Sequence, residues 1–281
     1  MRFESTILPL LPSLAAAIAA PGINGMNCVW SETFEGAAGS SPDTSIWNIA
    51  TDIDTNDEVE TYTTSNNNLQ ISGGGTIQFV PRKSPTGLWT SGRIESVESW
   101  TPAAGQVMMI AANLRLGTNA QANKQGLWPA FWMLGDAVRH GTPWPQCGEI
   151  DIFEQVNGVM EGHGTLHCGT DPGGPCDETD GISAEVALAD DDFHTWSVKI
   201  DLTNSDWTAQ TISFQLDGNT YQTVTGASIN DQAVWSTLAH SPMYMILNVA
   251  VGGDWPGPPN ADTLDGYGAM MEVAYAAVYS T

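Results

Sequence analysis

The chain has 281 residues, of which 32 are Asp or Glu and 8 are Lys or Arg, so its formal net charge is −24 at pH 7. Such an acidic surface repels the phosphates of nucleic acids and of anionic lipids, and we expect neither nucleic acid nor a membrane as a partner. A neutral polymer is compatible with this charge, and the 11 tryptophans offer flat apolar faces that suit sugar rings as well as a protein core.

The first 20 residues have the layout of a secretory signal peptide. Arg2 precedes an apolar run that starts at Ile7 and ends in the small-residue pattern Ala17-Ile18-Ala19. The run is too short to span a bilayer, and two prolines interrupt it. The alternative is an apolar N-terminal helix of the fold. We expect residues 1–20 to be a signal peptide, residues 21–281 to form one domain, and the protein to be secreted into the extracellular space.

From residue 28 onward, short runs of β-branched and aromatic residues alternate with turn residues. The segment FHTWSVKIDLT (193–203) places Trp196, Val198, Ile200 and Leu202 on one face of a strand, because side chains alternate with period two. The segment TISFQLDGNTYQTV (211–224) predicts a hairpin that turns at Asp217-Gly218. Further strands are predicted at 107–116, 164–169, 244–253 and 270–279.

No stretch combines helix caps with a long apolar period of 3.6 residues. Many short strands over this length predict an all-β fold, an antiparallel sandwich or barrel. The Asn- and Gly-rich segment 65–75 is interpreted as a loop within the domain. The acidic segment 171–192 is interpreted as a solvated surface loop rather than a calcium site, because the EF-hand spacing is absent.

The four cysteines allow three disulfide pairings, as expected of a secreted chain with an even count. Cys168 and Cys176 flank the tight loop GTDPGGP, so we expect these two to be bonded. Cys28 and Cys147 remain as the second pair. No Cys or His spacing indicates zinc, and no cofactor is expected.

Three carboxylates crowd the segment CGEIDIFEQVNG (147–158), whose centre has the composition of a strand. Strand alternation puts Glu149 and Asp151 on one face but would put Glu154 on the other. A β-bulge at Ile152-Phe153 resets the alternation and returns Glu154 to the same face. The alternative is a solvated polar face of a surface strand.

Carboxylates that share a face raise one another's proton affinity. That arrangement suits glycoside hydrolysis, which needs one ionised and one protonated carboxyl on either side of a bond. Spacing along the strand leaves both the retaining and the inverting geometry open. Asp151 can hold a proton or hydrogen-bond to Glu149, and so tune which acid is ionised.

The motif GEIDIFE resembles the bulged E-[IL]-D-[IL]-x-E signature of laminarinase-type members of glycoside hydrolase family 16. Further segments follow in that family's order: VWSETFEG, WTSGRIES, GLWPAFWMLG, HGTLHCG, DDFHTWSV and ILNVAVGGDWPG. The resemblance covers nearly all of residues 21–281. It implies a β-jelly-roll of two antiparallel sheets with a concave substrate cleft. We expect a single catalytic domain and a monomer.

The resemblance also implies roles for the three acids. Glu149 would be the nucleophile, Glu154 the general acid/base, and Asp151 would assist both. The implied activity is a secreted, retaining endo-β-glucanase that cuts β-1,3 or mixed β-1,3-1,4 glucan. The alternatives are a β-1,3-galactan hydrolase or transglycosylase of the same family, and a glucan-binding lectin without activity. The presence of both glutamates argues against the lectin.

Other residues are candidates for substrate binding. Trp128 and Trp132 share a face if their segment is extended, and by resemblance at least one lines the cleft. Trp255 follows two glycines in a loop and suits stacking on a sugar ring, while His167 would lie within reach of the carboxylates. Arg93 either bonds sugar hydroxyls or pairs with an acid such as Glu95.

Two further expectations concern residues away from these candidates. His194 and Trp196 are expected to be core residues. The last strand has Ala274 where family members carry an aspartate ligand for calcium, which puts that calcium site in doubt.

Overall fold

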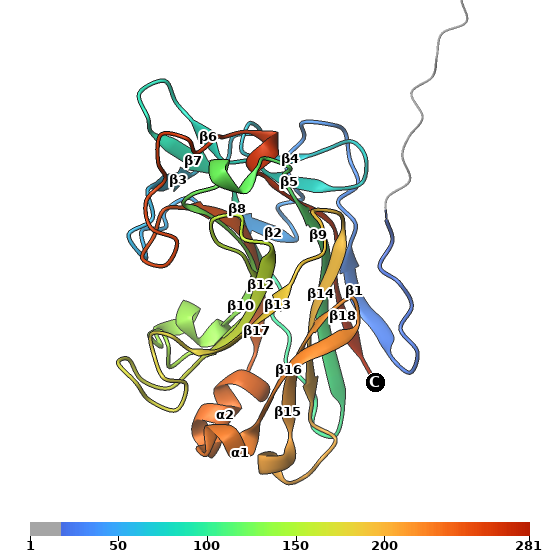
Figure 1. The fold of residues 1–281 in the computed structure, drawn as a ribbon. Coiled ribbons are helices and arrows are strands. Elements are labelled where there is room, and N and C mark those ends of the chain that lie inside the picture. Colours follow the sequence, from blue (N-terminus) through green and yellow to red (C-terminus); the bar gives the residue numbers. More distant parts are fainter. Residues whose placement is uncertain (1–17) are drawn as a thin grey trace, which may run out of the picture.

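Two antiparallel sheets make up most of the structure, a computed structural model that describes residues 18–281 (Figure 1). The first sheet has the spatial order β16 (Asn219–Thr225), β15 (Thr211–Leu216), β14 (His194–Asp201), β9 (Val107–Leu116), β18 (Met271–Ser280), β5 (Ile77–Phe79) and β4 (Leu69–Ile71), and β1 (Asn27–Glu32) also pairs with β18. The second has the order β13 (Ile182–Ala187), β12 (Glu161–His167), β11 (Glu149–Glu154), β10 (Leu127–Gly135), β17 (Met243–Val251), β8 (Arg93–Ser96) and β2 (Trp47–Ile49).

Smaller elements cover the ends of these sheets. A third sheet contains β3 (Glu60–Tyr62), β7 (Trp89–Ser91) and β6 (Arg82–Lys83), with β3 and β7 parallel. The helices are α1 (Gly226–Ile229), α2 (Gln232–Ala239) and the 3₁₀ turns η1 (Gln121–Asn123), η2 (Asp136–His140), η3 (Trp207–Ala209) and η4 (Tyr267–Ala269). No helix within residues 18–281 is long and apolar enough to cross a bilayer.

The core lies between the two large sheets. The ring of Phe153 on β11 lies 4.6 Å, centroid to centroid, from that of Trp196 on β14. Beside β11 in the same sheet, β12 has glycine at 162 and 164, where a Cβ atom would collide with the rings of Trp196 and Phe214 of the first sheet. The two sheets can approach each other here because β12 presents backbone alone.

The all-β sandwich is therefore confirmed, and all of the expected strands are present. Trp196, Val198, Ile200 and Leu202 are all buried on the inner face, as their alternation predicts. In the hairpin of β15 and β16, Leu216 pairs with Asn219 around Asp217-Gly218. Both turn residues have positive φ, 49° and 77°, as the twist of a two-residue hairpin requires.

Three segments differ from the interpretation of the sequence. Segment 65–75 is not wholly a loop, because β4 lies within it and buries Leu69 and Ile71. Segment 171–192 contains the edge strand β13 and is only partly a surface loop. Helix α2 was not predicted, although Asp231 caps it by accepting hydrogen bonds from two backbone N–H groups.

The disulfide between Cys168 and Cys176 is present, with Cα atoms 5.4 Å apart. The second expected pair is wrong. Cys28 is exposed on β1 of the first sheet, whereas Cys147 is buried just before β11 of the second, and both thiols are free. The signal-peptide interpretation falls almost wholly on residues 1–17, which lie outside the described part of the chain.

Contrary to expectation, His194 is not a core residue. Its Nδ1 lies 2.7 Å from Asp217 and its Nε2 3.1 Å from Asp190, both on the surface. Trp196, two residues on, is buried as expected. The strand therefore enters the core between these two positions.

A buried carboxyl group on β3 makes the stability of the fold depend on pH. Glu60 is 8% exposed, and its Oε2 accepts a hydrogen bond of 2.7 Å from the N–H of Val251 on β17. Burial, and next the charge of Glu58, raise the pKa of Glu60 from 4.5 to about 8. The folded protein therefore holds a proton that the unfolded chain releases between about pH 4.5 and pH 8.

We expect Glu60→Gln to be increasingly more stable than the parent as the pH rises through this window. The amide keeps the bond from Val251 but cannot ionise, so the gain is near zero at pH 4.5 and on the order of 2–4 kcal/mol above pH 8. Urea unfolding at pH 4.5, 6 and 8 measures it. Glu185→Gln, which removes an exposed carboxylate on β13, is the control. A difference between Glu60→Gln and the parent that does not change with pH would contradict the assignment.

Candidate active site

A β-bulge brings the three carboxylates of β11 to one face. Trp132 of β10 pairs with Asp151 and the preceding Phe131 pairs with Phe153, so Ile152 is an extra residue with no partner on β10. The register between β11 and β12 also shifts between Asp151 and Glu154. Ile150, Ile152 and Phe153 all belong to the core, which leaves Glu149, Asp151 and Glu154 on the outer face of the second sheet.

The surroundings of Glu154 shift its pKa toward neutrality. It is only 7% exposed, and its Oε1 accepts a hydrogen bond of 2.9 Å from Nε1 of Trp128. Burial raises the pKa of Glu154 from 4.5 to about 7, against the opposing effects of the Trp128 hydrogen bond and the charge of His167. Below neutral pH this residue therefore carries a proton that it can donate.

Glu149 and Asp151 are in different electrostatic situations. Burial raises the pKa of Glu149, while the positive charge of His167 opposes the rise. Burial and then the charges of Glu149 and Glu154 raise the pKa of Asp151 well above its ordinary value. Asp151 lies between two carboxyl groups that repel its charge, and is therefore shifted strongly toward its protonated form.

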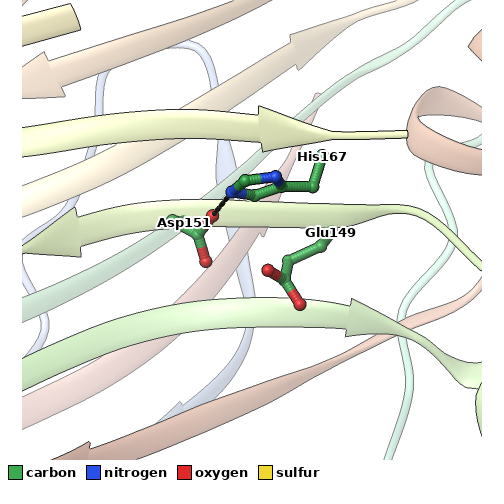
Figure 2. A group of neighbouring side chains, drawn as sticks. All are labelled: Glu149, Asp151 and His167. Atoms are coloured by element: carbon green, nitrogen blue, oxygen red, sulfur yellow. Dashed lines mark ion pairs between the residues drawn. The ribbon is translucent and has the colours of Figure 1, made fainter. Parts of the chain in front are cut away.

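His167 lies next to these acids at the end of β12. Its Cα pairs with that of Glu149 across the two strands, and Nε2 lies 3.5 Å from Oδ2 of Asp151 (Figure 2). On the other side of the ring, Nδ1 lies 2.7 Å from Oε2 of Glu178. Burial opposes protonation of the ring, but the charges of Glu149 and Glu178 outweigh it and raise the pKa of His167.

These contacts also bear on metal binding. Within residues 18–281, Glu149, Asp151 and His167 form the one cluster of metal-ligand side chains, with ligand atoms within 4.8 Å of one another. A protonated imidazole has no lone pair to give to a metal. Since the surrounding acids favour that form of His167, we assign the cluster to proton sharing. Ala274, where the resemblance suggested a lost calcium ligand, is buried beside a bulge of β18 and offers no side-chain oxygen.

Four tryptophans, which we call the aromatic rim, surround the acids. Trp128 and Trp132 project from β10, and their ring nitrogens donate to Glu154 and to Asn248 respectively. Trp255 is 45% exposed and meets Trp128 edge to face, with ring centroids 5.7 Å apart. Trp144 is 38% exposed and lies 5.6 Å from the ring of His167. The rim offers apolar ring faces on both sides of the carboxylates.

The remaining candidate, Arg93, is engaged by the protein itself. Its guanidinium forms a 2.7 Å ion pair with Glu95 and lies 5.0 Å from the ring of Trp132. Arg93 was expected either to bond sugar hydroxyls or to pair with an acid such as Glu95, and the structure contains the ion pair with Glu95. All the other predicted site residues lie around the three acids.

Three residues near the acids were not predicted. Trp144 was detectable in principle, because it lies between two prolines five residues before Glu149. Asn248, which orients Trp132, and Glu178, which contacts His167, have no local pattern that would mark them.

A cavity of about 540 Å³ lies elsewhere, between α2 and the loop after β14. Trp207, Gln210 and His240 are among its lining residues, and none of the lining residues is a carboxylic acid. The cavity therefore cannot supply paired acid and base groups, which occur instead on β11.

Comparisons with known proteins agree with this geometry. The model of the family described as "XgeA-like, catalytic GH16 domain" matches residues 89–226. A β-glucanase of Rhodothermus marinus is 30% identical over 266 residues, which cover 89% of this chain and 84% of that protein. The identity therefore extends well beyond the segment matched by the family model.

Solved structures extend the similarity to the whole fold. An endo-1,3-β-glucanase from Streptomyces sioyaensis has a TM-score of 0.88 at 37% identity, covering 94% of this chain and 99% of that one. An endo-β-1,3-glucanase from Pyrococcus furiosus has a TM-score of 0.72 at 31% identity, covering 91% and 94%. The jelly-roll expectation is thereby confirmed.

The hydrogen bond from Trp128 makes a prediction about Glu154. In Trp128→Phe the carboxylate loses a donor to its charged form, so its pKa should rise above about 7, by on the order of half a unit to one unit. Carbon NMR of protein labelled at glutamate carboxyls, with the signal assigned by Glu154→Gln, measures the titration. Trp132→Phe is the matched control, because its ring nitrogen donates to Asn248. Equal shifts in the two variants would refute the assignment.

Proposed function

Because the chain belongs to glycoside hydrolase family 16, we propose that it is an endo-acting β-glucanase that hydrolyses β-1,3 bonds and retains the anomeric configuration. The relatives described above include endo-1,3-β-glucanases at 31–37% identity over nearly the whole chain. Mixed β-1,3-1,4 glucan, which also consists of β-linked glucose, is proposed as a second substrate. The carboxylates, the aromatic rim and the acidic surface support a neutral polysaccharide as the substrate.

The observation that carries the proposal is the pair of glutamates, Glu149 and Glu154, that the bulge places on one face of β11. Hydrolysis with retention needs a carboxylate nucleophile and a protonated acid. Burial raises the pKa of both glutamates and the charge of His167 opposes the rise in each, and the pKa of Glu154 is about 7. Below neutral pH Glu154 can therefore donate a proton, and we assign the nucleophile to Glu149, which pairs with His167 across the two strands.

The reaction then follows in two displacements. Glu149 attacks the anomeric carbon, and the leaving glycosidic oxygen takes the proton of Glu154. Glu154, now a carboxylate, accepts a proton from water as that water releases the sugar from Glu149. Asp151, which holds its proton firmly, can donate a hydrogen bond without adding a third negative charge.

The aromatic rim is proposed to bind the glucan on both sides of the scissile bond. Trp255 contacts Trp128, which in turn donates to Glu154, so a sugar stacked on Trp255 would lie on the Glu154 side. Trp144 contacts His167 and would serve the Glu149 side. Secretion is also proposed, since the Cys168–Cys176 disulfide suits an oxidising compartment.

We expect Glu149→Gln and Glu154→Gln each to lower kcat/KM on laminarin by at least about a thousandfold, because each removes one half of the acid–nucleophile pair. Thermal unfolding should show that both variants fold. In the parent, kcat/KM should fall above about pH 7, where Glu154 loses its proton. Proton NMR of the first product should show the β-anomer.

Azide provides a further test of the assignment. It should partly restore turnover to an alanine variant at one of these two positions and leave the parent unaffected. Near-normal rates in both glutamine variants, or an α-anomer as first product, would contradict the proposed mechanism. Parallel assays on lichenan, barley glucan and β-1,3-galactan distinguish the possible linkages.

Trp255→Ala tests the aromatic rim. Stacking contributes binding in both the ground and transition states, so KM on long glucan should rise roughly tenfold or more, with kcat nearly unchanged. The melting temperature should change little, because the ring is nearly half exposed. Leu264→Ala, which truncates a similarly exposed apolar residue, is the control. If melting falls by many degrees while KM is unaltered, Trp255 is a packing residue.

A further inference from the structure

Glu178 is a buried carboxylate that the proposed reaction does not use. Its side chain is fully buried, and both of its oxygens have partners. Oε1 accepts a hydrogen bond of 2.7 Å from the backbone N–H of Cys168, and Oε2 lies 2.7 Å from Nδ1 of His167. A charge placed so far from solvent needs such partners, and here they lead toward the acids of β11.

The loop that carries Glu178 is closed in two ways. The disulfide joins Cys168, the residue after His167, to Cys176, two residues before Glu178. In addition, the backbone N–H groups of Gly173 and Glu178 each donate to the other residue's carbonyl, at 2.6 Å. The carboxylate therefore has a fixed position relative to the end of β12.

His167 connects this carboxylate to the acids. With Nδ1 facing a carboxylate, the proton on that nitrogen is held, and the ring orientation is determined. The other nitrogen, Nε2, then points toward Asp151, 3.5 Å away, with Glu149 on the same side (Figure 2). This chain of contacts runs from the disulfide loop to Asp151, and the ligand atoms of Asp151, His167 and the proposed nucleophile Glu149 lie within 4.8 Å of one another.

We propose that Glu178 is a positioning residue that acts through His167: it holds the ring by Nδ1 so that a protonated Nε2 faces Asp151 and Glu149. The inference rests on the proposed function, since it assigns a role in the same reaction. Glu178 itself does not touch the reacting atoms. Its effect is to keep a positive charge beside the carboxylate that must stay ionised.

The charges around the ring agree with this role. Glu149, Asp151 and Glu154 face His167 from β11, Glu178 faces it from the loop, and the uncharged Trp144 ring lies against it. Burial alone would lower the pKa of His167, and Glu149 and Glu178 together reverse the direction. His167 in turn opposes the rise in the pKa of Glu149.

The first test is a titration of the Glu178→Gln variant. The amide has nearly the same shape but no charge, and it can no longer stabilise the imidazolium. Nitrogen–proton NMR of the imidazole should show that the pKa of His167 is above its ordinary value of 6.5 in the parent and falls by about one unit in the variant. This result does not depend on any activity, so it stands even if the proposed function fails.

The second test is the pH profile of kcat/KM on laminarin. In Glu178→Gln the acidic limb, which reports ionisation of Glu149, should move up by about half a pH unit, a roughly threefold loss of kcat/KM below the limb, because weakening the His167 charge outweighs the removal of the Glu178 charge, which itself raises the pKa of Glu149. The basic limb, set by Glu154, should move less. Asp180→Asn, which removes an exposed charge two residues away, is the matched control and should not move either limb. Glu178→Asp, which keeps the charge, should bring the acidic limb part of the way back to its position in the parent.

A variant at His167 separates positioning from loop stability. His167→Gln should move the acidic limb in the same direction, and adding Glu178→Gln to it should produce no further upward shift, because the charge of Glu178 by itself raises the pKa of Glu149. If Glu178→Gln does not fold, the His167→Gln profile decides alone, and an unmoved acidic limb there overturns the proposal. A lower melting temperature for Glu178→Gln with an unchanged His167 titration would also overturn it, because Glu178 would then only brace the loop.

Discussion

The packing of the two sheets at Trp196 is the contact on which the site depends. Phe153 lies against this ring, and Gly162 allows β12 to approach it. The inner face of β11 is therefore held by buried apolar contacts while its outer face carries three acids that repel one another. Apolar burial contributes about 25 cal/mol for each Å² removed from water, which can offset that repulsion. A strand exposed on both faces could not keep the same charges together.

Burial of the acids also determines which of the neighbouring groups bind protons. Several carboxyl groups and one imidazole share a region from which water is largely excluded, and their charges cannot all be present. The groups are affected unequally: the pKa of Asp151 is raised well above its ordinary value, the pKa of Glu154 is about 7, and the charges of Glu149 and Glu178 raise the pKa of His167. The chemistry of the site thus comes from the order in which neighbouring groups titrate, and only in part from the residue types themselves.

Much of the fold could be predicted from the sequence, because long strands such as 107–116 and 193–203 show strong alternation or apolar runs. The row of acids and its bulge were also predictable, since Glu154 breaks the alternation set by Glu149. Elements with little local signal were missed. Strand β4 buries only Leu69 and Ile71, β13 is a half-exposed edge, and α2 has eight residues.

The contacts of Glu178 and Asn248 could not be predicted for a different reason. Each side chain meets its partner only after chain closure, across 11 residues for Glu178 and His167 and across 116 residues for Asn248 and Trp132. Likewise, nothing in the sequence indicates that Cys28 and Cys147 belong to different sheets. These are properties of the assembled sandwich rather than of any segment.

The bulge also bears on how this strand can change during evolution. In an ordinary half-buried strand, losing one residue turns every later side chain to the opposite face and is ruinous. Here, deleting Ile152 or Phe153 would remove the extra residue and leave Glu149, Asp151 and Glu154 in strict alternation, still on the outer face. A deletion of one residue at this position, or the insertion that reverses it, would therefore leave all three acids outside the core. Such a change would alter the spacing of the acids along the strand, and with it the fit to the substrate.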